Sequence, residues 1–156
     1  MKIDPQVEAK FSRLAENVHM WNTHHDNTWD ASISDNLTII EARPDFLVFE
    51  FVVAENHTNG IGNLHGGCVA TLIDLCSSLA ILVSHEKHVP WRTPGISTEL
   101  AVSYIAGAPE GTKLRIENEL LRSGKTLANL YTKIYNESGK LCYSGTHTKF
   151  CMDSKF

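Results

Sequence analysis

One acidic residue interrupts the longest apolar stretch of the chain. Between Leu64 and Ser84, Asp74 is the only residue with a formal charge. A carboxylate inside an apolar helix is costly unless it is paired, hydrated or neutral. Buried ionisable groups often mark functional sites because burial moves their acidity toward useful values. Asp74 is therefore the first candidate for a catalytic residue, and a structural acid beside a neighbouring serine is the alternative.

The sequence His65-Gly66-Gly67 stands at the start of the same apolar stretch. Glycines let a ligand approach the backbone closely, and the first turn of a helix offers unpaired N–H groups at the positive end of its dipole. Such donors can polarise a carbonyl and hold the oxyanion that forms when the carbonyl is attacked. The alternative is a glycine-rich helix entry with a structural, hydrogen-bonding His65.

The spacing of these two features limits how they can cooperate. Gly66 and Asp74 are eight positions apart, which corresponds to about 12 Å along a helix, whereas both groups must lie roughly 3 Å from one reacting group. One helix cannot supply both, but a second copy of the helix, antiparallel across a two-fold axis, can. If both features act in one site, the protein must be at least a dimer with shared sites.

The elements around this helix follow from residue periodicity. Residues 4–21 predict an amphipathic helix, with Asp4 as its cap and Pro5 at its first position. Its apolar stripe consists of Val7, Phe11, Leu14, Val18 and Trp21. Residues 22–35 are polar and predict a loop.

The remaining segments predict a sheet around one helix. Residues 37–42 and 46–54 predict a hairpin with a turn at 43–45, and residues 55–67 are rich in Asn and Gly and predict an irregular segment. Residues 66–84 are apolar all round, which predicts a helix buried on all sides. After a loop at 85–94, four strands are expected at 96–105, 112–121, 126–136 and 141–150. In 112–121, Leu114, Ile116, Asn118 and Leu120 share one face, which is typical of a half-buried antiparallel sheet.

Composition limits the class of protein. A chain of 156 residues fits one domain, with an N-terminal helix and loop at 1–34 and the main part at 35–156. A net charge of -4 and a pI of about 6.0 argue against nucleic acid as a partner. Four cysteines without a CxxC pair predict reduced thiols, and the start of the chain has no apolar signal region. No membrane span is expected, because the apolar run from Cys68 to Val83 is short and contains Asp74.

At HTNGIGNLHGGCVATLIDLCSS the sequence resembles the hotdog-fold acyl-CoA thioesterases, in particular the phenylacetyl-CoA-thioesterase-like branch that includes thioesterase superfamily member 2. The resemblance continues through PGISTELAVSYI, LLRSGKTLANLYTKIYN and SGKLCYSGTHTKF and covers about residues 35–150. It implies an α+β hotdog fold, in which an antiparallel sheet wraps around one long central helix and an N-terminal helix is added. It also implies hydrolysis of acyl-CoA to a free acid and CoA.

The resemblance assigns roles to individual residues. Asp74 would be the general base or the nucleophile at the thioester, and the Gly66 N–H would polarise its carbonyl. Asn59 and His65 would help to hold the carbonyl or the catalytic water, and Ser97 would position the water near Asp74.

Contacts to CoA are implied along two segments. The first runs from Tyr104 to Pro109 and the second joins two strands; the residues concerned are Gly67, Tyr104, Ile105, Ala106, Gly107, Arg122, Ser123, Gly124, Lys125 and Thr126. Cations and turn amides in the second segment suit the phosphates of CoA. The family further implies a dimer or a dimer of dimers. CoA is part of the substrate, so no separate cofactor and no metal are expected, and the cytoplasm is the expected compartment, with mitochondria as the alternative.

Other functions were weighed against this one. A hydratase or dehydratase on the same fold would use His65 with Asp74, and a non-catalytic acyl-CoA-binding module would bind without releasing thiol. Ser123-Gly124-Lys125-Thr126 is not a P-loop, because Glu119 stands where that motif needs glycine. His19, His24, His25 and Asp26 lack the spacing of a metal site. The loop 85–94, longer than in relatives, could reshape the acyl pocket.

Overall fold

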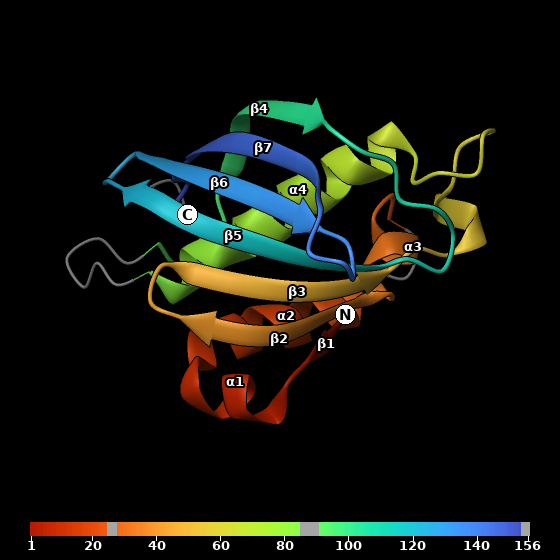
Figure 1. The fold of residues 1–156 in the computed structure, drawn as a ribbon. Coiled ribbons are helices and arrows are strands. Elements are labelled where there is room, and N and C mark those ends of the chain that lie inside the picture. The colour runs from red at the N-terminus through yellow and green to blue at the C-terminus, as the bar shows by residue number, and fades with distance from the viewer. Residues whose placement is uncertain (25–27, 85–90, 154–156) are drawn as a thin grey trace.

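The computed structural model describes residues 1–24, 28–84 and 91–153. Figure 1 shows a curved sheet with one long helix behind it. In chain order the elements are β1 (Lys2–Ile3), α1 (Pro5–Lys10), α2 (Ser12–His24), α3 (Ala31–Ser34), β2 (Leu37–Arg43), β3 (Phe46–Val52), η1 (Glu55–His57), α4 (Gly66–Ala80), η2 (Ile81–Val83), β4 (Ile96–Tyr104), β5 (Lys113–Ser123), β6 (Leu127–Tyr135) and β7 (Leu141–Phe150).

The seven strands form one sheet in the order β1-β2-β3-β5-β6-β7-β4. All pairings are antiparallel except β1 with β2, which is parallel. The connection through α4 carries the chain from β3 across the sheet to β4, which is the edge strand opposite β1. This confirms the predicted antiparallel sheet around a central helix, while the short strand β1 was missed because two residues carry no periodicity.

Helix α4 supplies the centre of the core. Val69, Leu72, Ile73 and Cys76 are completely buried. The segment Gly66–Val83 is long and apolar enough to cross a membrane, but 72% of it is buried inside this fold. The expectation that α4 is buried on all sides is wrong for the single chain, because Gly67 is exposed and Ala70, Thr71 and Asp74 are only half-buried along one stripe.

The sheet places its alternating residues as predicted. Leu114, Ile116, Asn118 and Leu120 of β5 all face the core and are buried. The one polar member of this row, Asn118, has its amide satisfied: its Nδ2 donates to the Leu47 carbonyl and its Oδ1 accepts from the Thr132 hydroxyl. Buried polar groups are tolerated when they are paired in this way.

The N-terminal region differs from the single helix expected over 4–21. Asp4 does cap the first helix, since its side chain accepts from the N–H groups of Gln6 and Val7. The helix breaks at Phe11, whose φ is -123° and ψ is 72°, so that α1 contacts β2 while α2 contacts η2. Helix α2 then runs to His24 and the short helix α3 lies in the predicted loop 22–35. Periodicity missed the break because the apolar stripe is continuous across it.

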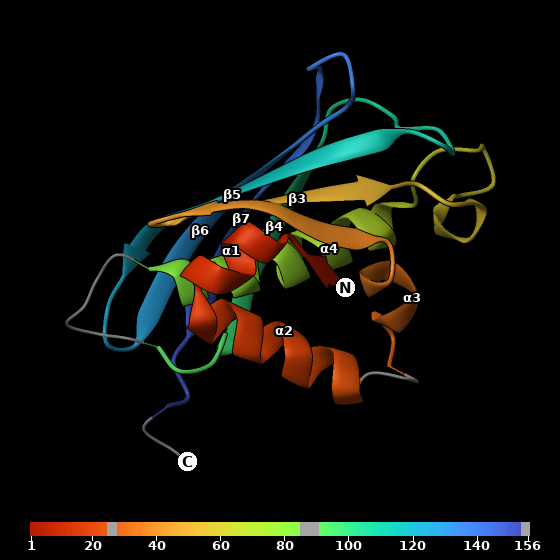
Figure 2. The ribbon, with the colours of Figure 1, turned by 90° about the horizontal axis from the view of Figure 1, so that it is seen from below.

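Arg13 ties α2 to the end of the central helix. Its Nε and Nη2 donate to the Leu82 carbonyl at 3.1 and 2.7 Å, and its Nη1 donates to the Trp91 carbonyl at 3.0 Å. Carbonyls at a helix C-terminus lack partners within the helix and attract cations. Figure 2 shows α2 on the same side of the sheet as α4, and α2 contacts η2, the segment that follows α4. The N-terminal region is therefore fixed to the element that carries Asp74.

We expect Arg13→Met to lower the free energy of unfolding by about 2 kcal/mol or more, because hydrogen bonds from charged donors contribute roughly 1.5–3 kcal/mol each and two carbonyls lose their partner. Urea unfolding at one protein concentration measures the loss. The control is Arg92→Met, since the side chain of Arg92 is exposed. Equal effects of the two substitutions would contradict the anchoring role.

Candidate active site

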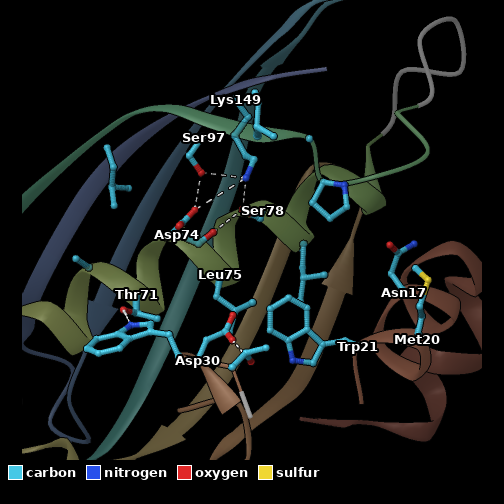
Figure 3. A pocket seen from close by; sticks show the side chains of 18 of the residues that line it. Asn17, Met20, Trp21, Asp30, Thr71, Asp74, Leu75, Ser78, Ser97 and Lys149 are labelled. Atoms are coloured by element: carbon cyan, nitrogen blue, oxygen red, sulfur yellow. Dashed lines mark hydrogen bonds and ion pairs between the residues drawn. The ribbon is translucent and has the colours of Figure 1, made fainter. Parts of the chain in front are cut away.

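Asp74 lies against the first residues of β4. Its Oδ1 accepts a hydrogen bond from the Ser97 hydroxyl at 2.8 Å. The two residues come from α4 and β4, which contact each other in this region (Figure 3). Ser97, which was expected to position water near Asp74, therefore lies in direct contact with that carboxylate. The Asp74 side chain keeps 46% of its surface exposed in the single chain, so the expectation of a buried carboxylate is wrong for one protomer.

A buried lysine completes this cluster. The Lys149 side chain is only 4% exposed, and its Nζ donates to the hydroxyls of Ser78 at 2.6 Å and Ser97 at 3.2 Å. The same Nζ lies 3.9 Å from Asp74 Oδ1. Figure 3 shows the resulting ring of contacts at one end of a cavity. Burial lowers the pKa of Lys149, and the Asp74 carboxylate opposes this shift.

His147 approaches Asp74 from β7, the strand that also carries Lys149. Its Nδ1 lies 2.7 Å from the Ser77 hydroxyl, and its Nε2 lies 3.4 Å from Asp74 Oδ1 without a hydrogen-bond partner. Burial, aided by the Lys149 ammonium, lowers the pKa of His147 to about 4, although Asp74 acts in the opposite direction. The ring is therefore neutral at pH 7, and Lys149 is the cation beside Asp74.

Sequence reasoning missed both of these residues. Strand β7 alternates so that Tyr143, Gly145, His147 and Lys149 face inward. Gly145 lies close against the helix, because a Cβ there would lie 3.0 Å from Ile73 Cδ1. The sequence therefore held a signal that could have identified these residues: His147 and Lys149 are polar, yet they occupy inward-facing positions of a strand that packs on α4.

The entrance of α4 forms a second group of polar atoms. His65 caps the helix, since its Nδ1 accepts from the Gly67 N–H at 2.9 Å. Within the described part of the chain, the Gly66 N–H has no recorded partner, whereas the Gly66 carbonyl accepts from the Tyr104 hydroxyl. Asn59 Oδ1 accepts from the N–H groups of Ile61 and Asn63. These contacts leave the Gly66 N–H and the Asn59 amide nitrogen as donors.

The two groups of residues lie apart in the protomer, separated by about 12 Å along α4. We call Asp74, Ser97, His147 and Lys149 the acid half-site, and Asn59, His65, Gly66 and Tyr104 the amide half-site. Ser97 and Tyr104 stand near opposite ends of the same strand, β4. Residues Ile96 and Tyr104 are eight positions apart, which is about 27 Å in a strand. One chain does not bring the two half-sites together, as the helix spacing predicted.

The two segments expected to contact CoA are separated in the same way. Residues 104–109 leave the Tyr104 end of β4, where Asn63 packs so closely on Gly107 that a Cβ would meet its Oδ1 at 2.4 Å. The turn between β5 and β6 lies at the other end, because Leu127 pairs with Phe150, which also pairs with Ile96. Arg122 and Ser123 belong to β5 rather than to the turn. The segment joins two strands, which agrees with the rejection of a P-loop.

An apolar cavity of about 1080 Å³ opens beside the acid half-site. Asp74, Ser97 and Lys149 line one end (Figure 3). The rest of the lining comes from α4, the start of β4 and the N-terminal region, and includes Asn17, Met20, Trp21, Trp29, Asp30, Leu75, Leu79, Pro94, Ile96 and Leu100. The N-terminal region was not expected to take part in this lining. Its contribution was missed because no local pattern connects α2 to β4.

Several predicted features fall outside this arrangement. His19 forms an exposed contact of 2.6 Å with Glu8. His25, Asp26 and residues 85–90 of the predicted loop 85–94 lie outside the described residues. Trp91, at the end of that loop, is buried and donates its Nε1–H to the Gly124 carbonyl. All four cysteines are free, and Cys68 and Cys76 are buried as predicted.

Comparisons with known proteins agree with this fold. The family model of the thioesterase superfamily matches residues 61–143. The mouse acyl-coenzyme A thioesterase 13 is 36% identical over 118 residues, which cover 75% of this chain and 81% of the relative. The crystal structure of zebra fish thioesterase superfamily member 2 superposes with a TM-score of 0.76 at 32% identity, covering 88% of this chain and 97% of the other. A hypothetical thioesterase protein with coenzyme A from Streptococcus pneumoniae gives a TM-score of 0.71 at 25% identity, covering 85% and 95%.

The shifted pKa of His147 predicts an acid-sensitive fold. Because the unfolded histidine titrates near 6.5 and the folded one near 4, the unfolded state binds a proton first as the pH falls. Stability should drop between these two values, by up to about 1.4 kcal/mol per pH unit. Urea unfolding of the wild type and His147→Gln at pH 7, 5.5 and 4.5, at one protein concentration, measures the difference between their slopes. Identical slopes in the two proteins would contradict this assignment.

Proposed function

The chain belongs to the thioesterase superfamily, and we propose that it hydrolyses acyl-CoA thioesters to a free carboxylic acid and CoA at a site shared by two copies of the chain. The observation that carries the proposal is the contact of Asp74 with Ser97 beside an apolar cavity. The name of the mouse relative, acyl-coenzyme A thioesterase 13, and the coenzyme A in the pneumococcal structure support the substrate class.

The free edge of the sheet supports the dimer. Among the described residues strand β4 is paired only with β7, and seven of its nine positions are exposed in the single chain; the two exceptions are Leu100 and Val102. A long unpaired edge strand is a template for another strand. If β4 of two copies pair antiparallel, Tyr104 of one copy comes next to the partner's Ile96 end. The amide half-site of each chain then meets the acid half-site of its mate.

In the shared site each group has a separate task. The Gly66 N–H and the Asn59 amide nitrogen polarise the thioester carbonyl and stabilise the oxyanion, as donors in an oxyanion hole do, while His65 keeps the helix entrance in shape. Asp74 either takes a proton from water, whose oxygen attacks the thioester carbonyl, or attacks that carbonyl itself to form a transient anhydride that water then hydrolyses. In both routes the C–S bond breaks and CoA leaves as a thiolate that takes up a proton. Ser97 holds the water, and Lys149 keeps the serine and the carboxylate in position.

The same pairing gathers the proposed CoA contacts. Arg122, Ser123, Gly124, Lys125 and Thr126 of one chain come to the side where its mate carries residues 104–107 and Gly67. The side chains of Arg122 and Lys125 are exposed and free to meet phosphates. A second pairing of two dimers is part of the same proposal and rests on the family resemblance. The cytoplasmic location, which the four free cysteines support, and the absence of a separate cofactor, since CoA is part of the substrate, belong to the proposal as well.

Asp74→Asn tests the proposal directly. The substitution removes the base or nucleophile but keeps the shape, so kcat should fall by roughly 10²–10⁴-fold, while CoA binding by calorimetry stays close to that of the wild type. The control is Asp30→Asn, a second carboxylate that lines the cavity. Turnover in H₂¹⁸O separates the two mechanisms, because only the anhydride route places label in Asp74. Unchanged turnover by Asp74→Asn would end the proposal.

Mixing two inactive variants tests the shared site. Gly66→Pro removes the N–H at the first helical position, where proline is tolerated, and His65 already has a φ of -64° and a ψ of 135° that suit a following proline. Heterodimers of Gly66→Pro with Asp74→Asn contain one intact site and one doubly altered site. A random mixture should regain about a quarter of the wild-type activity, since half of the dimers are mixed and have one working site. If each site lay within one chain, the mixture would stay inactive.

A further inference from the structure

The cavity beside Asp74 gathers apolar side chains that the fold leaves exposed. Met20 is 56% exposed, Trp29 79% and Ile96 51%, and all three line this cavity. Single exposed apolar residues are common, but a cluster of them around one hollow marks a binding surface. Two of the three come from the N-terminal region, which lies outside the matched family segment 61–143.

The N-terminal wall is held in place by contacts to the catalytic helix. The Trp29 Nε1–H donates to the Thr71 hydroxyl at 3.1 Å, and Thr71 lies one helical turn before Asp74. Arg13 fixes the start of α2 to Leu82 and Trp91. Near the other end of α2, the side chain of Asn22 makes two hydrogen bonds to the main chain of Met1. The wall therefore has a defined position relative to Asp74.

The cavity has a reactive end and an apolar end. Figure 3 shows Asp74, Ser97 and Lys149 together, with Leu75 and Trp21 below them and Met20 away from the acid. The thioester carbon must lie beside Asp74, so the acyl chain has to leave from that point. The cavity that continues from this end is lined mainly by apolar side chains of α4, β4 and α2.

We propose that Met20, Trp21 and Trp29 form the acyl-binding wall of the enzyme and select aliphatic acyl groups of medium or long chain length. This inference rests on the proposed hydrolysis of acyl-CoA. The volume of about 1080 Å³ lies at the upper end of the range for small-molecule pockets, far above the need of an acetyl group. Met20, which is flexible and polarizable, suits a mobile alkyl chain. The acyl chain, and not a second protein, is the occupant, because the hollow begins at the reacting carboxylate.

The test fills the cavity at its far end. Met20→Trp introduces bulk at an exposed position of α2 that is not part of the core, and Glu16→Trp places the same side chain on the same helix outside the cavity. We measure kcat/KM for acetyl-, butyryl-, octanoyl-, dodecanoyl- and palmitoyl-CoA. Each buried methylene changes kcat/KM by roughly fourfold, so Met20→Trp should lose tenfold or more on the long substrates. Acetyl-CoA turnover and the whole profile of Glu16→Trp should match the wild type.

A binding measurement separates the two proposals. Calorimetry with S-dodecyl-CoA, a thioether that cannot be hydrolysed, should give tighter binding than CoA alone to the wild type and a loss of that gain in Met20→Trp. If both binding results are obtained but the wild type hydrolyses no acyl-CoA, the acyl-binding wall is supported and the proposed hydrolysis is wrong. If hydrolysis occurs but Met20→Trp changes all chain lengths equally or none, the wall is wrong. A parallel loss at every chain length with a changed sedimentation coefficient would also overturn it, because this face would then be a contact between chains.

Discussion

Asp74 and the Gly66 amide stand on the same helix, and the rise of an α-helix holds them about 12 Å apart. The other residues of the site fall into two groups, one around each of these two positions. Ser97, His147 and Lys149 gather around the acid, whereas Tyr104 and His65 gather around the amide. Strand β4 runs from one group to the other at the open edge of the sheet. A rigid helix thus creates two incomplete sites, and a two-fold axis is the simplest way to complete both.

The acid half-site also has to satisfy two buried basic groups. A buried ammonium is costly unless several partners compensate for its lost hydration. Lys149 has Ser78, Ser97 and the Asp74 carboxylate around it, while His147 stays neutral. The Lys149 Nζ, 3.9 Å from Asp74 Oδ1, is therefore the basic group that faces the carboxylate. Its hydrogen bond to Ser97 also fixes the position of the serine hydroxyl beside Asp74.

Sequence patterns predicted correctly those features of the fold that depend on neighbouring residues in the chain. Helix α4, the β2–β3 hairpin, the inward row of β5 and the Asp4 cap could all be predicted, and the pairing of Asp74 with Ser97 came from the family resemblance. His147 and Lys149 were missed because their meaning depends on which strand packs against α4. The break at Phe11 and the half-exposed Asp74 were missed because tertiary contacts decide both. The sequence of α4 is apolar on all sides, and this pattern does not tell whether its remaining face packs against a sheet, a ligand or another chain.

The exposed stripe of α4 connects the proposed dimer, the proposed chemistry and the proposed acyl wall. Thr71 and Asp74 lie on it, and Trp29 reaches Thr71 from the N-terminal region. In a single chain this stripe is open to water, which would hydrate the carboxylate and weaken its electrostatic contacts. An acyl chain in the cavity and a partner strand along β4 would remove bulk water from opposite sides. Only the water held by Ser97 and Asp74 would then remain near the thioester, so substrate binding itself would produce the low-dielectric surroundings in which the Gly66 amide stabilises an oxyanion best.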